Sequence, residues 1–378
     1  MAPEEVEAFI AKINQFKEKS ASDHDGEARC FYTLWENEGA RIWERVPLAD
    51  LIDSIEEGTG RQDWKKLRPF DLLPELDPDT GGCAKKQLMI GEKLKIASEA
   101  ICGSEPYFHR AGDFQTIFFQ FSGSALLETS FGVFELNPGE AVLVPAMIAH
   151  RTTGSSNCRR MCFYVKDVLE VKLDPDKPLT DIRYEVRRPG EPQSAVSRLK
   201  PTAPVDGKIL ERLVHWDGRP EDAYIFKRTY SAMVGKAESG ARVVKIRPFD
   251  YFTTPPTGPK AAPVRTALLW EGPTFRQRVY SNPGVQPAPH RGYDEDEYWF
   301  QFSGCVEQIG EHGIYTVESG EVSMAEAGIS HTSINVPGSL RLTTYTNKPI
   351  RRIADPSEHL RVSRWEVHEN IVQGWREA

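Results

Sequence analysis

Short runs of apolar and aromatic residues, many of them ended by a glycine turn, recur along the chain. Residues 117–121 read Ile-Phe-Phe-Gln-Phe and residues 298–302 read Tyr-Trp-Phe-Gln-Phe, and Ser-Gly closes both runs. Residues 133–136 lead through Asn-Pro-Gly into another apolar run at 141–144, which predicts a strand, a turn and a strand. Many short strands with glycine turns at close spacing predict an all-β barrel or sandwich.

Helical periodicity is confined to the edges of this pattern. Residues 4–19 place Val6, Phe9, Ile10 and Phe16 on one face at helical spacing. Residues 47–57 begin with a proline and are followed by a glycine, as a short helix often is. We expect both to be peripheral helices, the first of them packed on a barrel as a lid.

The chain contains an internal repeat. With an offset of 181, residues 109–150 align with 290–331 without a gap, and 14 of the 42 positions are identical. The block Phe-Gln-Phe-Ser-Gly at 119–123 recurs at 300–304, and glycines and histidines that mark turns keep the same register. A repeat of this length predicts two copies of one domain.

The repeat divides the 378 residues into five parts. We expect a helical and extended region at 1–85, a first barrel at 86–166, and a connection that leads into the second half at 167–260. A second barrel follows at 261–350, and a helical segment at 351–378. A chain of this length suits two domains.

Composition and charge exclude several classes of function. The net charge is −8, so a general nucleic-acid or polybasic membrane surface has no electrostatic driving force. No apolar run is long enough to span a bilayer, and the first residues are acidic where a secretory signal is basic. We therefore expect a cytoplasmic protein with no nucleic-acid or membrane partner.

Both copies resemble the cupin family at its two motifs. The second copy has Gly284, five residues, His290, then Glu297, six residues and Gly304. Its second motif runs from a glycine at 320 through Glu-Ala-Gly at 326–328 to His331 and, three residues later, an asparagine. The second copy departs from the family pattern at two positions. It has glutamate at 326, where the family has proline, and glycine at 292, where the family has a second histidine. The resemblance implies an all-β bicupin of two tandem double-stranded β-helix, or jelly-roll, barrels.

The resemblance implies a metal site in the second copy, held by His290, Glu297 and His331. Two imidazoles and one carboxylate form the facial triad of non-haem Fe(II) enzymes, which leaves coordination positions open. We expect Fe(II), with Mn(II) and Ni(II) as alternatives. Asp294, Glu295 and Asp296 crowd the same loop and could replace Glu297, but the six-residue spacing to the glycine favours Glu297.

The first copy lacks that carboxylate. At the offset of 181, Thr116 stands where the second copy has Glu297, while His109 and His150 remain. Two histidines alone make a weak iron site. We therefore expect a degenerate metal site in a barrel whose role is structural.

Residues near the triad are candidates for substrate contacts. Strand alternation places Trp299 and Gln301 on the face of Glu297, where Trp299 offers an aromatic wall and Gln301 a hydrogen bond. His312, on the next expected hairpin, is the candidate proton acceptor. Arg278 is our candidate for holding a substrate carboxylate, with two further arginines, at 276 and 341, as alternatives.

The set of His, Glu and His without a third histidine resembles the homogentisate and hydroquinone 1,2-dioxygenase group. This implies an Fe(II)-dependent, extradiol-type dioxygenase that opens the ring of a small para-diol with O₂ as co-substrate. Two rival hypotheses remain: a metal-dependent lyase or isomerase that does not use O₂, and a non-catalytic bicupin that binds a ligand. We expect a homo-oligomer, with a small partner subunit as one form of assembly in this group.

Overall fold

The computed structural model describes most of both expected barrels and parts of the regions around them. The described residues are 30–35, 39–45, 66–105, 108–129, 131–173, 208–216, 225–229, 242–252, 265–281, 284–285, 290–292, 295–310, 313–335 and 338–352. The helices expected at 4–19 and 47–57 lie outside them, as does 351–378 beyond residue 352. No helix in the described part of the chain has the length and hydropathy needed to cross a membrane.

Eight strands form the N-terminal barrel, which we define as β4 to β11. The last of them is long enough to serve two sheets: its first half pairs with β6 and β8, and its second half with β5 and β7. A register shift between Gly154 and Cys158 separates the two halves. The strands are β4 (Gly82–Gly91), β5 (Leu94–Ser104), β6 (Phe108–Ala111), β7 (Gln115–Ser122), β8 (Ala125–Thr129), β9 (Gly132–Leu136), β10 (Ala141–Val144) and β11 (His150–Val165).

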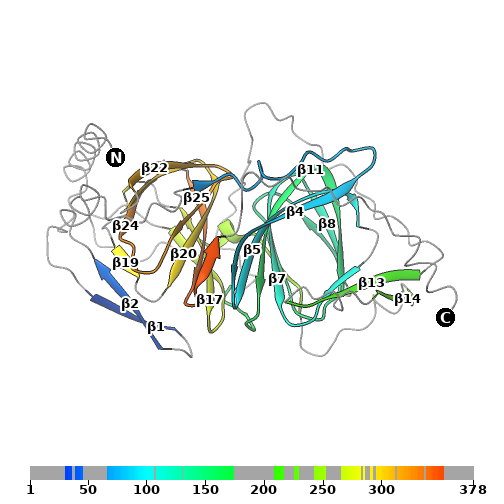
Figure 1. Cartoon of the computed structure of the whole chain (residues 1–378), viewed down its shortest axis with the longest axis horizontal. Coiled ribbons are helices and arrows are strands. Elements are labelled where there is room, and N and C mark those ends of the chain that lie inside the picture. The colour runs from blue at the N-terminus through cyan, green and yellow to red at the C-terminus, as the bar shows by residue number, and fades with distance from the viewer. Residues whose placement is uncertain are drawn as a thin grey trace.

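The C-terminal barrel, β16 to β25, repeats this plan and lies beside the first (Figure 1). Strands β20 and β23 have the bounds of β7 and β10 shifted by 181 residues, and β24 with β25 corresponds to the long β11. The strands are β16 (Arg265–Glu271), β17 (Phe275–Ser281), β18 (Gly284–Val285), β19 (His290–Gly292), β20 (Asp296–Ser303), β21 (Cys305–Gly310), β22 (Gly313–Glu318), β23 (Val322–Ala325), β24 (His331–Asn335) and β25 (Leu340–Thr346). The prediction of an all-β fold with two tandem barrels is confirmed.

Four short strands are exchanged between the barrels. Strand β3 (Lys66–Leu67) precedes the N-terminal barrel but pairs with β23, whereas β15 (Val244–Ile246) precedes the C-terminal barrel but pairs with β10. In the same way β12 (Glu170–Val171) pairs with β16, and β26 (Ile350–Arg352) pairs with β4. Sheet edges carry N–H and C=O groups that need partners, and here each barrel's edges are covered by strands that adjoin the other barrel in sequence.

The remaining described elements lie outside the barrels' own strands. The hairpin of β1 (Cys30–Trp35) and β2 (Gly39–Arg45) adds to β19. The hairpin of β13 (Lys208–Val214) and β14 (Ile225–Thr229) adds to β6, and a 3₁₀ turn, η3, spans Pro248–Tyr251.

Several described strands fall near or outside the boundaries of the regions expected from the sequence. Strand β4 begins at Gly82, four residues before the expected start of the first barrel. The expected connection at 167–260 contains β12 to β15, which pair with the barrels. Residues 350–352 form a strand where a helical segment was expected to start, because they cover the edge of β4.

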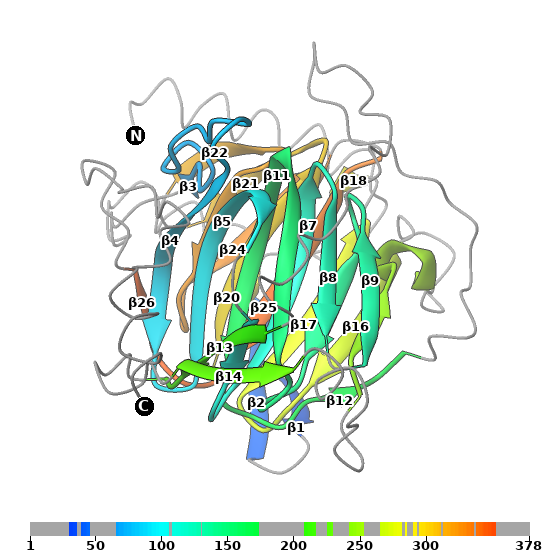
Figure 2. The same ribbon diagram turned by 90° about the vertical axis from the view of Figure 1, so that its right-hand side faces the viewer.

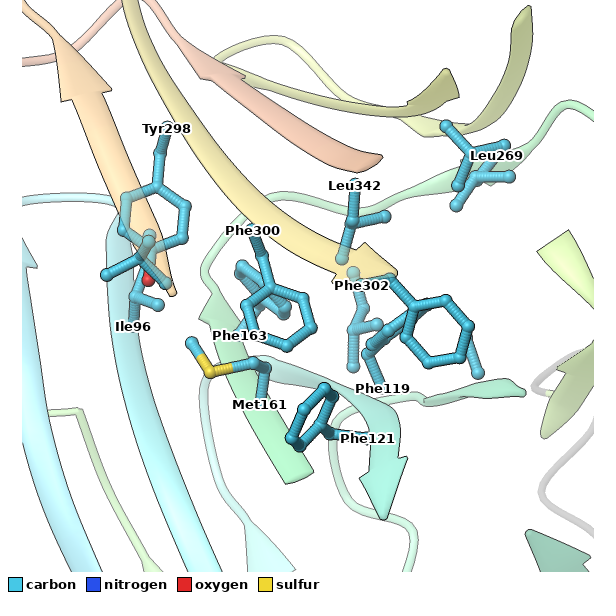
Figure 3. Packing of buried hydrophobic residues seen from close by; sticks show 14 of the residues in the cluster. Ile96, Phe119, Phe121, Met161, Phe163, Leu269, Tyr298, Phe300, Phe302 and Leu342 are labelled. Atoms are coloured by element: carbon cyan, nitrogen blue, oxygen red, sulfur yellow. The ribbon is translucent and has the colours of Figure 1, made fainter. Parts of the chain in front are cut away.

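An aromatic cluster joins the barrels. Side chains from β7 and β20 meet edge to face, with ring centroids 5.4 Å apart for Phe119 and Phe302 and 5.5 Å apart for Phe121 and Phe300 (Figure 3). All four are at most 1% exposed. Because strand side chains alternate between faces, the residues between these phenylalanines point into their own barrel. The repeated Phe-Gln-Phe block therefore builds the interface with its aromatic residues and the barrel interior with its glutamine.

Two of the repeated glycines are required by this interface. Gly139 and Gly320 have φ values of +84° and +85°, a conformation that favours glycine. A Cβ on Gly139 would lie 3.1 Å from Phe302, and one on Gly320 would lie 2.9 Å from Phe121. The contacts are reciprocal, so the two copies pack with approximate two-fold symmetry.

Candidate functional site

Three rows of side chains line the interior of the C-terminal barrel where β17, β25 and β20 pair. The strand registers place one residue of each strand in every row. The rows are Arg276, Tyr345 and Glu297; then Arg278, Thr343 and Trp299; then Tyr280, Arg341 and Gln301. Apart from Ala325, which pairs with Glu297 from β23, and Leu268, which pairs with Arg278 from β16, the positions in and beside these rows are polar or aromatic.

Glu297 and His331 form the centre of this interior. Glu297 is 4% exposed, as is His331, and the closest approach of the carboxylate to Nε2 of His331 is 3.7 Å. Nδ1 of His331 lies 3.1 Å from the carbonyl oxygen of Ile329, so this nitrogen donates to the backbone and leaves Nε2 with its lone pair. A buried carboxylate beside an imidazole oriented in this way has the chemistry of a divalent-metal ligand pair.

The backbone of His290 lies beside that of His331. Its strand β19 pairs with β24 so that His290 lies directly opposite His331. Its side chain is outside the described residues. The register alone therefore brings the third predicted ligand to the same end of the barrel.

Trp299 lies against the histidine and Gln301 does not. The Trp299 and His331 rings meet edge to face with centroids 5.0 Å apart, and Trp299 is 4% exposed. Gln301 sits two rows away from Glu297, where Nε2 donates to the Ser303 carbonyl and the Ser339 hydroxyl. The expected hydrogen bond from Gln301 near the metal is absent among the described residues, since its amide group holds the end of its own strand.

The three candidate arginines differ in their surroundings. Arg276 is buried between two carboxylates, 3.7 Å from Glu271 and 3.5 Å from Glu295. Arg278 is half-buried in the middle row. Arg341 is 6% exposed, and its Nε and Nη1 have no hydrogen-bond partner in the described part of the chain. Its guanidinium carbon lies 5.8 Å from the Trp299 ring centroid.

Two tyrosines close this interior. The hydroxyls of Tyr280 and Tyr345 are 2.7 Å apart, and Tyr345 pairs with Glu297 across the strands. The predicted acid–base residue, His312, lies outside the described residues. Neither tyrosine was singled out from the sequence, although their alternation with buried apolar residues could have indicated them.

The N-terminal barrel repeats the rows with different chemistry. Its middle row, Ala97, Cys162 and Phe118, is less polar than its counterpart, and Thr116 occupies the place of Glu297. His109 and His150 face each other across the strands, with ring centroids 6.3 Å apart. The arrangement of an aromatic ring beside the histidine is conserved between the copies, since Phe118 lies 5.6 Å from His150.

A carboxylate that the repeat alignment does not reveal accompanies these histidines. Glu105 accepts from Nε2 of His109 at 3.0 Å and from the Thr152 backbone N–H at 2.6 Å. Burial raises the pKa of Glu105, but the His109 cation and these hydrogen bonds outweigh it and lower the pKa to about 2. Burial, with the His109 charge, lowers the pKa of His150 to about 4, so that ring is neutral at pH 7.

A cavity of about 370 Å³ opens beside this group. It extends to β13, which runs with β14 across one end of the barrel (Figure 2). Trp216 and Tyr164 form part of its wall, and Glu99 and Arg160 form a buried ion pair of 2.6 Å on it. The expectation of a structural barrel did not include a cavity of this kind.

Among the described residues, no three His, Cys, Asp or Glu side chains converge as a metal-binding group. The His290 side chain is not among them, so the C-terminal triad is represented by two of its three predicted ligands. Glu105, His109 and His150 are all described. The hydrogen bond between His109 and Glu105 engages the carboxylate and one of the two imidazoles.

Comparisons with known proteins give weak similarities. No family model matches the chain, and no curated protein matches it. A cupin 2 conserved barrel domain protein from Leptotrichia buccalis has a TM-score of 0.44 and 10% identity, over 75% of this chain and 96% of that one. Protein Ylba from E. coli has a TM-score of 0.40 and 9% identity, over 74% and 89%.

Oxalate decarboxylase from Bacillus subtilis is a third similar structure. One of its mutants has a TM-score of 0.42 and 13% identity, over 84% of this chain and 85% of that one. All three scores are below 0.5, and the two-barrel architecture rests on the strand pairing described above.

Proposed function

We propose that the C-terminal barrel is a metal-dependent catalytic centre and that the chain is an Fe(II)-dependent dioxygenase. The substrate would be a small hydroxylated aromatic of the para-diol class, opened with O₂. The observation that carries the proposal is the buried pair of Glu297 and His331, with Trp299 against the imidazole.

The donor set fits a divalent metal. His290, Glu297 and His331 would hold it, and iron, when bound, supplies a redox-active Lewis acid with open positions for two ligands. Glu297 contributes one negative charge, and the hydrogen bond from Nδ1 of His331 to the Ile329 carbonyl orients the imidazole ring. Such a set leaves net positive charge to attract a phenolate.

The surrounding side chains would orient and deprotonate the diol. Trp299 offers a buried aromatic face beside His331 on which a six-membered ring can pack. The paired hydroxyls of Tyr280 and Tyr345 provide a short route along which the phenolic proton can leave the interior. His312 remains the proposed proton acceptor.

Anaerobic iron loading followed by oxygen uptake with a panel of hydroquinones tests the proposal. We expect about one iron per chain, and both atoms of labelled O₂ in a ring-opened product. Glu297→Gln preserves size but removes the charged ligand, so iron content and oxygen uptake should fall to background. Glu105→Gln is the matched control in the other barrel, and it should retain both the iron content and the oxygen uptake. Circular dichroism verifies that each variant is folded before the two are compared.

Two outcomes would overturn the proposal. Iron retained by Glu297→Gln but lost by Glu105→Gln would place the site in the N-terminal barrel. Turnover that proceeds equally well without oxygen would favour the metal-dependent lyase or isomerase.

A further inference from the structure

Arg341 is a buried cation that forms no salt bridge with a described residue, and Glu297 acts on it only as a nearby charge. Its side chain is 94% buried, and within the described part of the chain its Nε and Nη1 donate no hydrogen bond. Tyrosine and tryptophan rings surround it, with the guanidinium carbon 5.5 Å from the Tyr280 centroid and 5.8 Å from that of Trp299. An arginine stays charged in a protein, so a buried guanidinium of this kind carries a desolvation cost that a bound anion would remove.

The N-terminal barrel provides an internal comparison. Arg160 is the counterpart of Arg341 at the offset of 181, and it is equally buried, with its guanidinium carbon 3.9 Å from the Phe118 centroid. There Glu99 neutralises it at 2.6 Å. The counterpart of Glu99 is Tyr280, which has no carboxylate. Among the described residues, one barrel therefore pairs its arginine with a carboxylate and the other does not.

We propose that Arg341 binds the carboxylate of a small aromatic acid inside the C-terminal barrel. This rests on the proposed function in one respect, namely that the acid is the substrate or a close analogue. Arg276 is less suited to the task because Glu271 and Glu295 already lie beside it.

The position of Arg341 sets the shape of the ligand. The Trp299 ring lies near both the guanidinium and the His331 imidazole, with its centroid 5.8 Å from the guanidinium carbon and 5.0 Å from the imidazole centroid. A ligand that packs on Trp299 can reach Arg341 with a carboxylate at one end and the Glu297–His331 pair with a hydroxyl at the other. The hydroxyl of Thr343, in the same row as Trp299, is buried, has no hydrogen-bond partner among the described residues, and can contact the ring substituents of such a ligand.

Calorimetric titration of the full chain with benzoate, and with neutral benzamide of similar shape, tests the proposal. We expect benzoate to bind at least tenfold more tightly than benzamide, because a charge-assisted bidentate contact is the stronger one. Tyr280→Glu gives Arg341 the partner that Arg160 already has, so benzoate affinity should fall at least tenfold. Tyr280→Gln removes the same hydroxyl without adding charge and should retain the preference for benzoate.

Arg341→Met provides a second route if Tyr280→Glu does not fold, and it should also abolish the preference for the anion. Benzoate binding that is unchanged in Arg341→Met, or that disappears only when a chelator removes metal, would overturn the proposal. So would equal affinities for benzoate and benzamide in the unmodified chain.

The titration separates the failure of this proposal from the failure of the proposed function. Benzoate binding that depends on Arg341, without oxygen uptake on any diol, would leave the anion site standing and remove the dioxygenase. Oxygen uptake on neutral hydroquinones, without benzoate binding, would support the dioxygenase and remove the anion site.

Discussion

Removal of the charge at Glu99 should expose how much the ion pair with Arg160 contributes to the N-terminal barrel. Both side chains are buried, and Glu99 Oε2 accepts from Arg160 Nε at 2.6 Å. Burial raises the pKa of Glu99, but Arg160 and Lys85 outweigh it and hold the pKa below the ordinary value of 4.5. The stabilisation is therefore present above pH 4.5 and is lost as the pH falls through the lower pKa of the folded state.

Glu99→Gln leaves Arg160 buried without an anion. Loss of one partner from a buried ion pair costs about 3–5 kcal/mol, because the remaining charge stays desolvated. We expect urea unfolding at pH 7, followed by circular dichroism, to show a loss of that size. Glu135→Gln, the same change at an exposed position of β9, should cost less than about 0.5 kcal/mol.

Benzoate should restore part of the stability of Glu99→Gln, since Arg160 lies on the wall of a cavity that can admit a small anion. At 100 times its dissociation constant, a ligand of the folded state contributes about 2.7 kcal/mol. A loss below about 1 kcal/mol, or the same loss at pH 7 and at pH 3, would refute this account of the pair.

Two further predictions concern the barrel interface and pH. Phe302→Ala should destabilise the chain by about 3–5 kcal/mol and Phe302→Leu by clearly less, with both barrels unfolding in one transition by fluorescence and circular dichroism. Separate transitions for the two barrels would contradict the shared core. Because the pKa of His150 is lowered from 6.5 to about 4 in the folded state, folding should lose about 3 kcal/mol as the pH falls from 6.5 to 4. His150→Phe should remove that slope in unfolding experiments at several pH values, and parallel curves for the two proteins would contradict it.

The repeat made most of the strand plan predictable from the sequence. The blocks at 119–123 and 300–304 set the register, and β20 and β23 have the bounds of β7 and β10 shifted by 181 residues. The exchanged strands could not be predicted, because β3 has two residues and its pairing with β23 depends on a sheet far along the chain. The pattern around 133–144 correctly gave two strands but suggested a hairpin, whereas β9 pairs with β8 and β10 with β7.

The sequence predicted those residues of the candidate site that belong to the repeated motif. The resemblance to the cupin motifs selected Glu297 and His331, and strand alternation placed Trp299 on the face of Glu297. Glu105 was missed because it precedes its histidine by four residues, outside the family pattern. Its proximity to His109 depends on the pairing of β5 and β6 with the distant β11, which local periodicity does not encode.

Charge compensation distinguishes the two interiors more sharply than the metal motif does. Both barrels bury an arginine over an aromatic ring that contacts a histidine, so this arrangement belongs to the shared fold. In the N-terminal barrel Glu99 pairs with the buried arginine, and the row beside this ion pair is largely apolar.

In the C-terminal barrel Tyr280 stands at the position of that glutamate, and Glu297 lies near the histidine instead. The C-terminal barrel thus has no carboxylate opposite its arginine and has one at the ligand position, so its interior holds a cation near Trp299 and an anion near His331. An interior polarised in this way is matched by a ligand with an anionic group at one end and a metal-binding hydroxyl at the other. Since each single replacement alone would leave a buried charge without a partner, the two differences make physical sense together, with the ligand and the metal supplying the charges that the chain does not.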